Sequence, residues 1–364
     1  MSVLYCGIDE AGYGPMLGPL TVGLAVFAID DWSEGDPAPD LWERMPRAVC
    51  KAVRGAGQRI PIADSKKLKL SNDSKKRHPC THLERGVLAA LATAGEATPD
   101  TDAELLELLC GEIPDLPWYG GQPAALPLGE PIETQRIGAN LLASAMHDAG
   151  VRLVHLCVRT ITEDRFNEIV RATGSKAQTT ATALADLLPL ASTLADAEPG
   201  TPVRIICDRQ SGRLDYEDIL ARAFPGEGAE MSMRTNHASR YLLRDGRVAV
   251  NFETQAEDRH LPTALASMAA KFVRELLMAR MNRYFRARMP ELKPTAGYVQ
   301  DARRWLRDAE GILAPKERTK MVRLACAPSP TQPRGCTTGG TWTWRRGPRC
   351  GPRAMSSPTP WSGR

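Results

Sequence analysis

Residues 7–20 read GIDEAGYGPMLGPL, and this stretch decides how the rest of the chain is interpreted. The residues that lead into it, 2–9 (SVLYCGID), form an apolar, β-rich run, and residues 19–28 (PLTVGLAVFA) form another. Two such runs on either side of a glycine- and proline-rich segment predict a hairpin of two buried strands. The stretch is therefore an unusually elaborate turn at the end of a first buried strand.

Two carboxylates, Asp9 and Glu10, stand side by side where the first predicted strand ends. Neighbouring residues of a strand point to opposite faces of the sheet, so both acids can serve one site only if Glu10 already lies in the turn. Gly12 and Gly14 free the backbone to bend sharply there, and their bare amides can approach a ribose or a phosphate closely. A plain turn explains the same glycines equally well.

The rest of the chain alternates apolar, strand-like runs with segments of helical periodicity. Further strands are predicted at residues 151–160, 203–208 and 247–253, which brings their number to five. Helices are predicted at residues 83–96, 136–149, 161–169 and 179–195, and from Pro262 to just before Pro290. Strands interleaved with helices predict an α/β fold with a mixed five-stranded sheet flanked by helices.

Composition and charge are those of a globular protein with one basic region. Of the 364 residues, 43% are apolar and 25% are charged, and no apolar run reaches the length of about 18 that would suggest a membrane span. The nine cysteines form no C-x-x-C pair, which argues against a zinc site and predicts reduced thiols in the cytoplasm. Residues 271–323 hold 14 Lys and Arg against 6 Asp and Glu. Such a surface suits a polyanion such as nucleic acid, although a solvated helical face has the same composition.

Three predicted strand ends carry acids: Asp9 with Glu10, Asp208, and Asp258 just before the long helix. If the sheet forms as predicted, these ends can converge at one edge. Several carboxylates within a few ångströms repel one another and take up protons unless a cation neutralises them. An all-oxygen site suits Mg²⁺ or Mn²⁺, and two such ions stabilise both the attacking and the leaving oxygen in phosphodiester cleavage. Acids at strand ends also commonly cap helices or form turns.

Five stretches, in order along residues 1–323, resemble the motifs of ribonuclease HII, the type 2 ribonuclease H family. The opening stretch is similar to the family pattern G-x-DEAG-[RK]-GP, and ADSKKL at residues 63–68 is similar to its DSKKL. The other three matches are VRIICD at residues 203–208, DRHLPTALASMAAK at residues 258–271 and AGYVQDARRWL at residues 296–306.

This resemblance implies a ribonuclease H-like fold and an endonuclease that cleaves the RNA strand of RNA–DNA hybrids, leaving 3′-hydroxyl and 5′-phosphate ends. It implies two divalent ions, Mg²⁺ or Mn²⁺, held by four catalytic acids: Asp9, Glu10, Asp208 and Asp258. It also implies substrate contacts at the phosphates, at the 2′-hydroxyl and at the neighbouring sugar. These contacts fall, respectively, on Lys66 and Lys67, on Gly12, Tyr13 and Gly14, and on Tyr298.

The chain departs from the family pattern at four places. Tyr13 stands where the family has Arg or Lys, which puts the recognition of single ribonucleotides in question. Arg209 follows the third acid where the family has Gly. Counted back from the lysine of the fourth motif, the fourth acid falls on Glu257, whereas the proline spacing places it on Asp258, which we prefer. Residues 98–133, rich in Pro, Gly and acids, have no counterpart in the family pattern and no evident chemistry.

The chain is accordingly divided into three parts. Residues 1–290 are predicted to be the catalytic domain, with residues 98–133 as an insertion, and residues 291–323 a basic substrate-binding segment. Residues 324–364 contain six arginines and no acid, and we interpret them as disordered. Two explanations of this tail stay open, a basic arm for nucleic acid and the out-of-frame translation of a GC-rich gene, of which we prefer the second.

Two other functions stay open as well. A catalytically silent protein that binds RNA–DNA hybrids is suggested by the changes at Tyr13 and Arg209. A ribonuclease H-like nuclease that acts on other nucleic-acid structures is the second. Under each of them the expected partner is nucleic acid, with no membrane and no obligatory protein partner.

Overall fold

The computed structural model describes residues 2–194, 200–210 and 212–325, which belong to one compact unit. The tail predicted at residues 324–364 therefore lies, beyond Ala325, outside the described residues, and its predicted disorder stays a prediction. Within the described ranges no helix combines the length and the apolarity needed to cross a bilayer.

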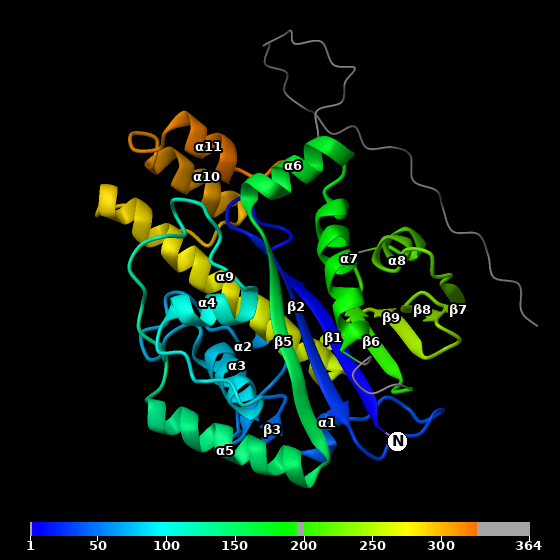
Figure 1. The fold of residues 1–364 in the computed structure, drawn as a ribbon. Helices are drawn as coiled ribbons and strands as arrows, with labels where there is room; N and C mark the ends of the chain where they lie inside the picture. The colour runs from blue at the N-terminus through cyan, green and yellow to red at the C-terminus, as the bar shows by residue number, and fades with distance from the viewer. Residues whose placement is uncertain (1, 195–199, 211, 326–364) are drawn as a thin grey trace, which may run out of the picture. The chain divides into compact units, whose positions relative to one another are not determined.

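A mixed sheet of seven strands occupies the centre of the unit (Figure 1). Its strands are β1 (Val3–Ala11), β2 (Leu20–Ile29), β5 (Val151–Ile161), β6 (Val203–Asp208), β7 (Glu230–Arg234), β8 (Ala238–Leu243) and β9 (Val248–Glu253). They lie in the order β5-β2-β1-β6-β9-β8-β7, with β6 parallel to both of its neighbours and the other pairs antiparallel. The α/β class and the five predicted strands are confirmed, and β8 and β7 extend the sheet beyond the predicted five.

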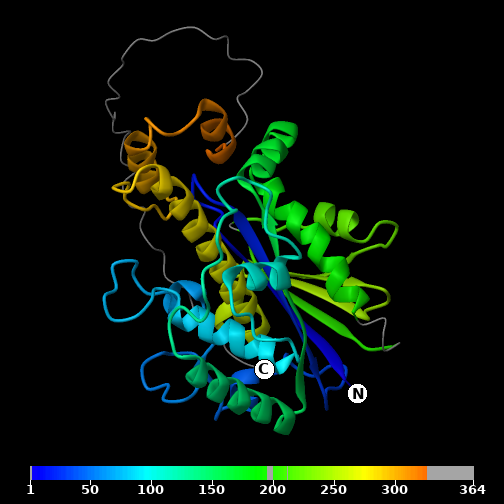
Figure 2. The ribbon, with the colours of Figure 1, turned by 60° about the vertical axis from the view of Figure 1, so that its left-hand side comes forward.

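Helices cover both faces of this sheet, as the two views in Figures 1 and 2 show. One face carries the long helix α9 (Leu261–Arg288), which runs across β1 and β2, and several shorter elements. These are α1 (Leu41–Arg44), β3 (Val49–Cys50), β4 (Ile60–Pro61), α2 (Ser65–Leu68), α3 (Thr81–Thr93), α4 (Asp102–Cys110), α5 (Ile132–Asp148) and α10 (Val299–Asp308). The other face carries α6 (Glu163–Thr173), α7 (Ala177–Thr193) and α8 (Glu217–Ala223), with α11 (Pro315–Met321) against α6.

Alternation along β1 divides its side chains between two apolar cores. Tyr5 belongs to the core under α9, whereas Cys6 and Ile8 belong to the core under α7. A Cβ atom on Gly7 would come within 2.0 Å of the Thr263 backbone nitrogen, so glycine allows α9 to lie directly on the strand. Because β1 and β2 are covered on both faces, they read as continuous apolar runs in the sequence.

The segment predicted as an insertion, residues 98–133, packs as part of the core. Trp118 and Tyr119 are fully buried in it. Asp102 at the start of α4 forms a buried ion pair with Arg280 of α9, with atom separations of 2.7 Å and 3.0 Å. A buried pair of this kind persists only when good hydrogen-bond geometry offsets the loss of water, which this double contact provides.

Candidate catalytic site

Asp9 and Asp208 lie next to each other on neighbouring parallel strands. Ile8 of β1 pairs with Cys207 of β6, and each aspartate follows its paired residue by one position. Both side chains therefore point to the face that α9 covers. Asp9 is only 8% exposed, and burial raises the pKa of its carboxyl, an effect that the nearby Ser267 of α9 partly offsets.

Glu10 points to the other face of β1. The strand continues to Ala11 and Glu10 pairs with Val22, so the turn begins after both acids and does not include Glu10, as a shared site would have required. Glu10 instead lines a small cavity beside α7. Glu10 still interacts electrostatically with the acids on the α9 face, because repulsion from Asp208 contributes, after burial, to the raised pKa of Glu10.

Glu257, and not Asp258, faces the other acids. Both lie in η1 (Ala256–Asp258), a single tight turn that points successive side chains in different directions. Glu257 is 8% exposed, and burial together with repulsion from Asp208 raises the pKa of its carboxyl. The Asp258 side chain is 41% exposed, and its Oδ1 accepts a hydrogen bond from Lys67 Nζ at 2.6 Å. The placement expected for Asp258 is therefore corrected: the structure brings Glu257 to that position.

We call Asp9, Glu10, Asp208 and Glu257 the acidic cluster, and each of its members has a raised pKa. Burial is the largest cause in each case, followed by repulsion from Asp208 for the other three. The pKa of Asp9 lies well above its ordinary value, and those of Glu10 and Glu257 are raised to about 7. Without a bound cation such a cluster holds protons near neutral pH.

The donor set of the acidic cluster fits a hard divalent cation such as Mg²⁺ or Mn²⁺. All four side chains offer carboxylate oxygens, and Glu257 Oε2 is buried with no hydrogen-bond partner. Within the part of the chain that the structure describes, no three His, Cys, Asp or Glu side chains are already gathered around one ion position. Carboxylates that repel one another keep apart, so their oxygens would have to draw together when an ion binds.

We expect the metal-free protein to be less stable at pH 8 than at pH 5.5. The pKa values of Glu10 and Glu257 in the folded protein, about 7, exceed the ordinary value of 4.5, so the folded state binds more protons across this window. Stability therefore falls as the pH rises from about 4.5 to 7, by an amount on the order of 1–3 kcal/mol. Thermal unfolding in a chelator measures the difference.

Two controls accompany this prediction. Added Mn²⁺ should raise the unfolding temperature more at pH 8 than at pH 5.5, because ions compete with protons for the same oxygens. The double variant Glu10→Gln, Glu257→Gln should lose most of the pH dependence. A wild-type protein that is more stable at pH 8 in chelator would contradict the raised pKa values.

The two predicted phosphate-binding lysines lie in α2, close to the acidic cluster. Asp64 caps this short helix by accepting the Lys66 backbone N–H at 2.9 Å. Partial desolvation lowers the pKa of the Lys66 ammonium, but Asp64 and Asp9 outweigh this and raise it. Lys66 is thus electrostatically coupled to the cluster, whereas Lys67 is paired with Asp258.

The glycines of the turn after β1 differ in what the fold requires of them. Gly12 has a φ of +89°, and a Cβ atom there would come within 2.5 Å of Arg274 Nε and 2.7 Å of Pro19 O. A Cβ atom on Gly14 would meet no atom within 4 Å. The backbone therefore requires glycine at position 12, whereas Gly14 opens onto free space that a ligand can approach.

A pair of substitutions separates these two roles. Gly12→Ala should destabilise the protein by about 1–3 kcal/mol through backbone strain and the contact with Arg274. Gly14→Ala should change stability by less than about 0.5 kcal/mol, and it should weaken substrate binding if the substrate lies against this position. Chemical denaturation and a binding titration measure the two effects, and equal stability losses would refute the distinction.

Arg323, which the sequence marks only as one of several basic residues, holds this turn in shape. Its Nη1 donates to Gly12 O at 2.5 Å and its Nη2 to Tyr13 O at 3.0 Å. The guanidinium lies 3.8 Å from the ring centroid of Phe166, and the residue is only 6% exposed. No local pattern distinguishes Arg323 from its neighbours, because its role depends on contacts with residues far away in the sequence.

Tyr298 lies beside the same turn. The carbonyl of Gly297 accepts hydrogen bonds from the backbone N–H groups of Met16 (2.8 Å) and Leu17 (3.2 Å). Tyr298 is 51% exposed, so its ring is accessible from solvent. The structure thus brings the predicted sugar-stacking residue next to the predicted ribose-contacting turn, and both roles stay predictions.

The basic segment at residues 291–323 forms α10 and α11. Part of its charge is used internally, since Arg304 pairs with Asp301 at 2.6 Å and with Asp308 at 3.1 Å. Substrate binding by this segment stays a prediction.

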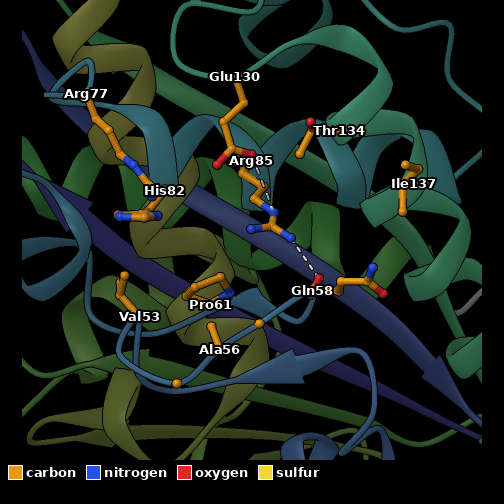
Figure 3. A pocket seen from close by; sticks show the side chains of 12 residues that line it. Val53, Ala56, Gln58, Pro61, Arg77, His82, Arg85, Glu130, Thr134 and Ile137 are labelled. Atoms are coloured by element: carbon orange, nitrogen blue, oxygen red, sulfur yellow. Dashed lines mark hydrogen bonds and ion pairs between the residues drawn. The ribbon is translucent and has the colours of Figure 1, made fainter.

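A larger cavity of about 530 Å³ lies away from the acidic cluster, between α3, α5 and the loop before β4 (Figure 3). Arg85 extends into it, with Nη2 donating to Gln58 O at 2.7 Å and Nε 3.8 Å from Glu130 Oε2. Figure 3 shows His82 and Arg77 on one side of Arg85 and Thr134 on the other. None of the four clustered acids lines this cavity.

No family model and no curated protein matches this chain. Among solved structures, similarity is found to ribonuclease HII of Archaeoglobus fulgidus in complex with PCNA, at 16% identity and a TM-score of 0.39, covering 92% of this chain and 98% of that one. Ribonuclease H2 of Pyrococcus horikoshii OT3 is 18% identical with a TM-score of 0.39, covering 88% and 93%. Bst-RNase HIII in complex with Mn²⁺ is 15% identical with a TM-score of 0.36, covering 88% and 66%. At TM-scores this low, the function has to be inferred from the residues of the site itself.

Proposed function

We propose that this protein is a divalent-metal-dependent endoribonuclease that cleaves the RNA strand of RNA–DNA hybrids and leaves 3′-hydroxyl and 5′-phosphate ends. The observation that supports it best is the acidic cluster. Its carboxylates come from β1, β6 and η1 and are largely buried, and all four have raised pKa values, to which repulsion from Asp208 contributes at the other three. A protein that retains such a repulsive group benefits from a cation that neutralises it.

The proposed roles follow from the placement of each residue. Asp9, Asp208 and Glu257 hold the ions, with Glu257 in the role expected of Asp258, while Glu10, which points to the other face of β1, adds negative charge beside them. Bound Mg²⁺ or Mn²⁺ would neutralise the phosphate and lower the pKa of the attacking water. The substrate is held by Lys66 and Lys67 at phosphates, by Gly12, Tyr13 and Gly14 at the scissile ribose, and by Tyr298 at the adjoining sugar.

A nicking assay tests the proposal. The full chain is incubated with Mg²⁺ or Mn²⁺ and a labelled RNA–DNA hybrid, alongside DNA duplex, RNA duplex and branched DNA of equal length. We expect metal-dependent cleavage of the hybrid RNA strand to products that a polymerase extends from their 3′ ends. Preferred cleavage of another substrate would identify a different nuclease.

A catalytically silent hybrid-binding protein is the second candidate. The observation in its favour is that, over the described residues, the acids are not already gathered around one ion. Binding of the hybrid without turnover under either metal would support this candidate and contradict the first.

A further inference from the structure

The cavity on the Glu10 side of β1 contains polar groups that the proposed function leaves unused. It measures about 220 Å³, and its lining includes Glu10, Tyr13, Thr180 and Gln210. Thr180 of α7 is 2% exposed, and its hydroxyl has no hydrogen-bond partner. Both amide atoms of the Gln210 side chain are buried and equally unpaired. Buried polar groups nearly always have partners, so a ligand or ordered water is expected here.

The balance of donors and acceptors narrows the chemistry of that ligand. Gln210 Nε2 can only donate, Gln210 Oε1 can only accept, the Thr180 hydroxyl can do both, and Glu10 adds accepting oxygens. Arg213 also lines the cavity, but its Nε donates to Asp215 O and its Nη2 to Asp218 Oδ1. A phosphate group supplies acceptors, which would leave the two accepting groups of the cavity unmatched. A hydroxyl group donates and accepts at once and matches both kinds. The volume lies below the range of about 300–1,000 Å³ typical of pockets for drug-sized molecules, and it suits one sugar.

The positively charged side chain of Lys176 lies beside Tyr13, which lines the cavity. Lys176, the residue just before α7, places its Nζ 4.4 Å from the ring centroid of Tyr13. The phosphate attached to a sugar in the cavity would find a counter-charge there. Lys176 and Gln210 thus add a charged and a neutral contact on the side of β1 opposite α9.

We infer that this cavity binds the ribose of a ribonucleotide adjacent to the scissile one, through its 2′-hydroxyl. The 2′-hydroxyl is both donor and acceptor, and DNA lacks it. The inference rests on the proposed function and makes its substrate more specific: at least two consecutive ribonucleotides in a duplex, in preference to a single one.

The test compares DNA duplexes that contain one ribonucleotide or two consecutive ones, with the added ribonucleotide on the 5′ or the 3′ side. For the wild-type protein, kcat/KM should be roughly 10-fold higher for one of the two-ribonucleotide duplexes. Thr180→Val, which replaces the hydroxyl by a methyl of similar shape, should reduce this ratio by roughly 2- to 10-fold, as should Gln210→Met. Thr182→Val is the matched control, because its hydroxyl donates to Gln178 O at 2.8 Å and does not line the cavity. It should keep the wild-type ratio.

A binding measurement distinguishes a failure of this inference from a failure of the proposed nuclease function. The same duplexes are titrated by fluorescence anisotropy in chelator, where no cleavage occurs. Tighter binding of the two-ribonucleotide duplex, weakened by Thr180→Val, supports the cavity assignment even if nothing is cleaved, and only the nuclease proposal then fails. Equal affinities for the two duplexes, or a ratio that Thr180→Val leaves unchanged in both assays, would mean that the cavity holds water only.

Discussion

Asp9→Asn is expected to abolish cleavage of RNA–DNA hybrids, lowering kcat on the order of 10³-fold. Asparagine has nearly the shape of aspartate but carries no charge and one fewer accepting oxygen. Asp9 is the most buried acid at the strand ends, and Asp208 and Glu10 both act on it, so its charge is central to any bound cation. Single-turnover nicking rates at saturating Mn²⁺ measure the loss.

Two further measurements on the same variant test whether the loss of cleavage comes from lost hybrid binding or from misfolding. Hybrid affinity in chelator should stay within a few-fold of the wild-type value, since Asp9 is only 8% exposed. The metal-free variant should also unfold at a higher temperature than the wild type at pH 8, because a buried, repelled carboxylate has been removed. A variant that cleaves at the wild-type rate would refute the acidic cluster as the catalytic site.

Glu257→Gln is expected to lower kcat by roughly 10²- to 10³-fold, whereas Asp258→Asn should stay within about 3-fold of the wild type. Glu257 is buried near Asp208, where, under the proposed function, a lost charge would remove an ion ligand. Asp258 forms an exposed ion pair with Lys67, and such pairs contribute about 0–1 kcal/mol. The two residues are adjacent in one turn, so each is the matched control for the other.

Nicking rates for the two variants, measured over a range of Mn²⁺ concentrations, distinguish the possible outcomes. Glu257→Gln should also require more Mn²⁺ for half-maximal rate, which a general structural defect would not cause. If Asp258→Asn proves to be the inactive variant, the proline spacing in the sequence identifies the fourth acid correctly and the placement of Glu257 has no catalytic meaning.

The framework of the fold is predictable because its signals are local. The apolar runs that become β1, β2, β5, β6 and β9 stand out in the sequence, and the long helix begins and ends near the prolines that bound it. β8 and β7 lack such signals. β8 is buried only at alternate residues, and four of the five β7 residues are exposed at the edge of the sheet.

The candidate site is predictable in its members but not in their orientation. Asp9 and Asp208 are recognisable at strand ends, and the pairing of β1 with β6 places them side by side. The direction of Glu10 depends on the point at which β1 stops, and the choice between Glu257 and Asp258 depends on the rotation of one turn of η1. Spacing along the chain specifies neither. Thr180 and Gln210 belong to no sequence motif. Only the structure identifies them, because their buried polar atoms have no hydrogen-bond partner.

The hydrogen bonds from Arg323 to the turn after β1 have a consequence for the order in which this protein folds. Arg323 and Gly12, which are joined by one of these hydrogen bonds, are 311 positions apart in the sequence. Contacts between such distant residues close the largest loops and form late in folding. A nascent or truncated polypeptide that ends before this arginine would carry every clustered acid but not the hydrogen bonds that shape the turn after β1. This turn would then acquire its final shape as one of the last events in the biogenesis of the molecule.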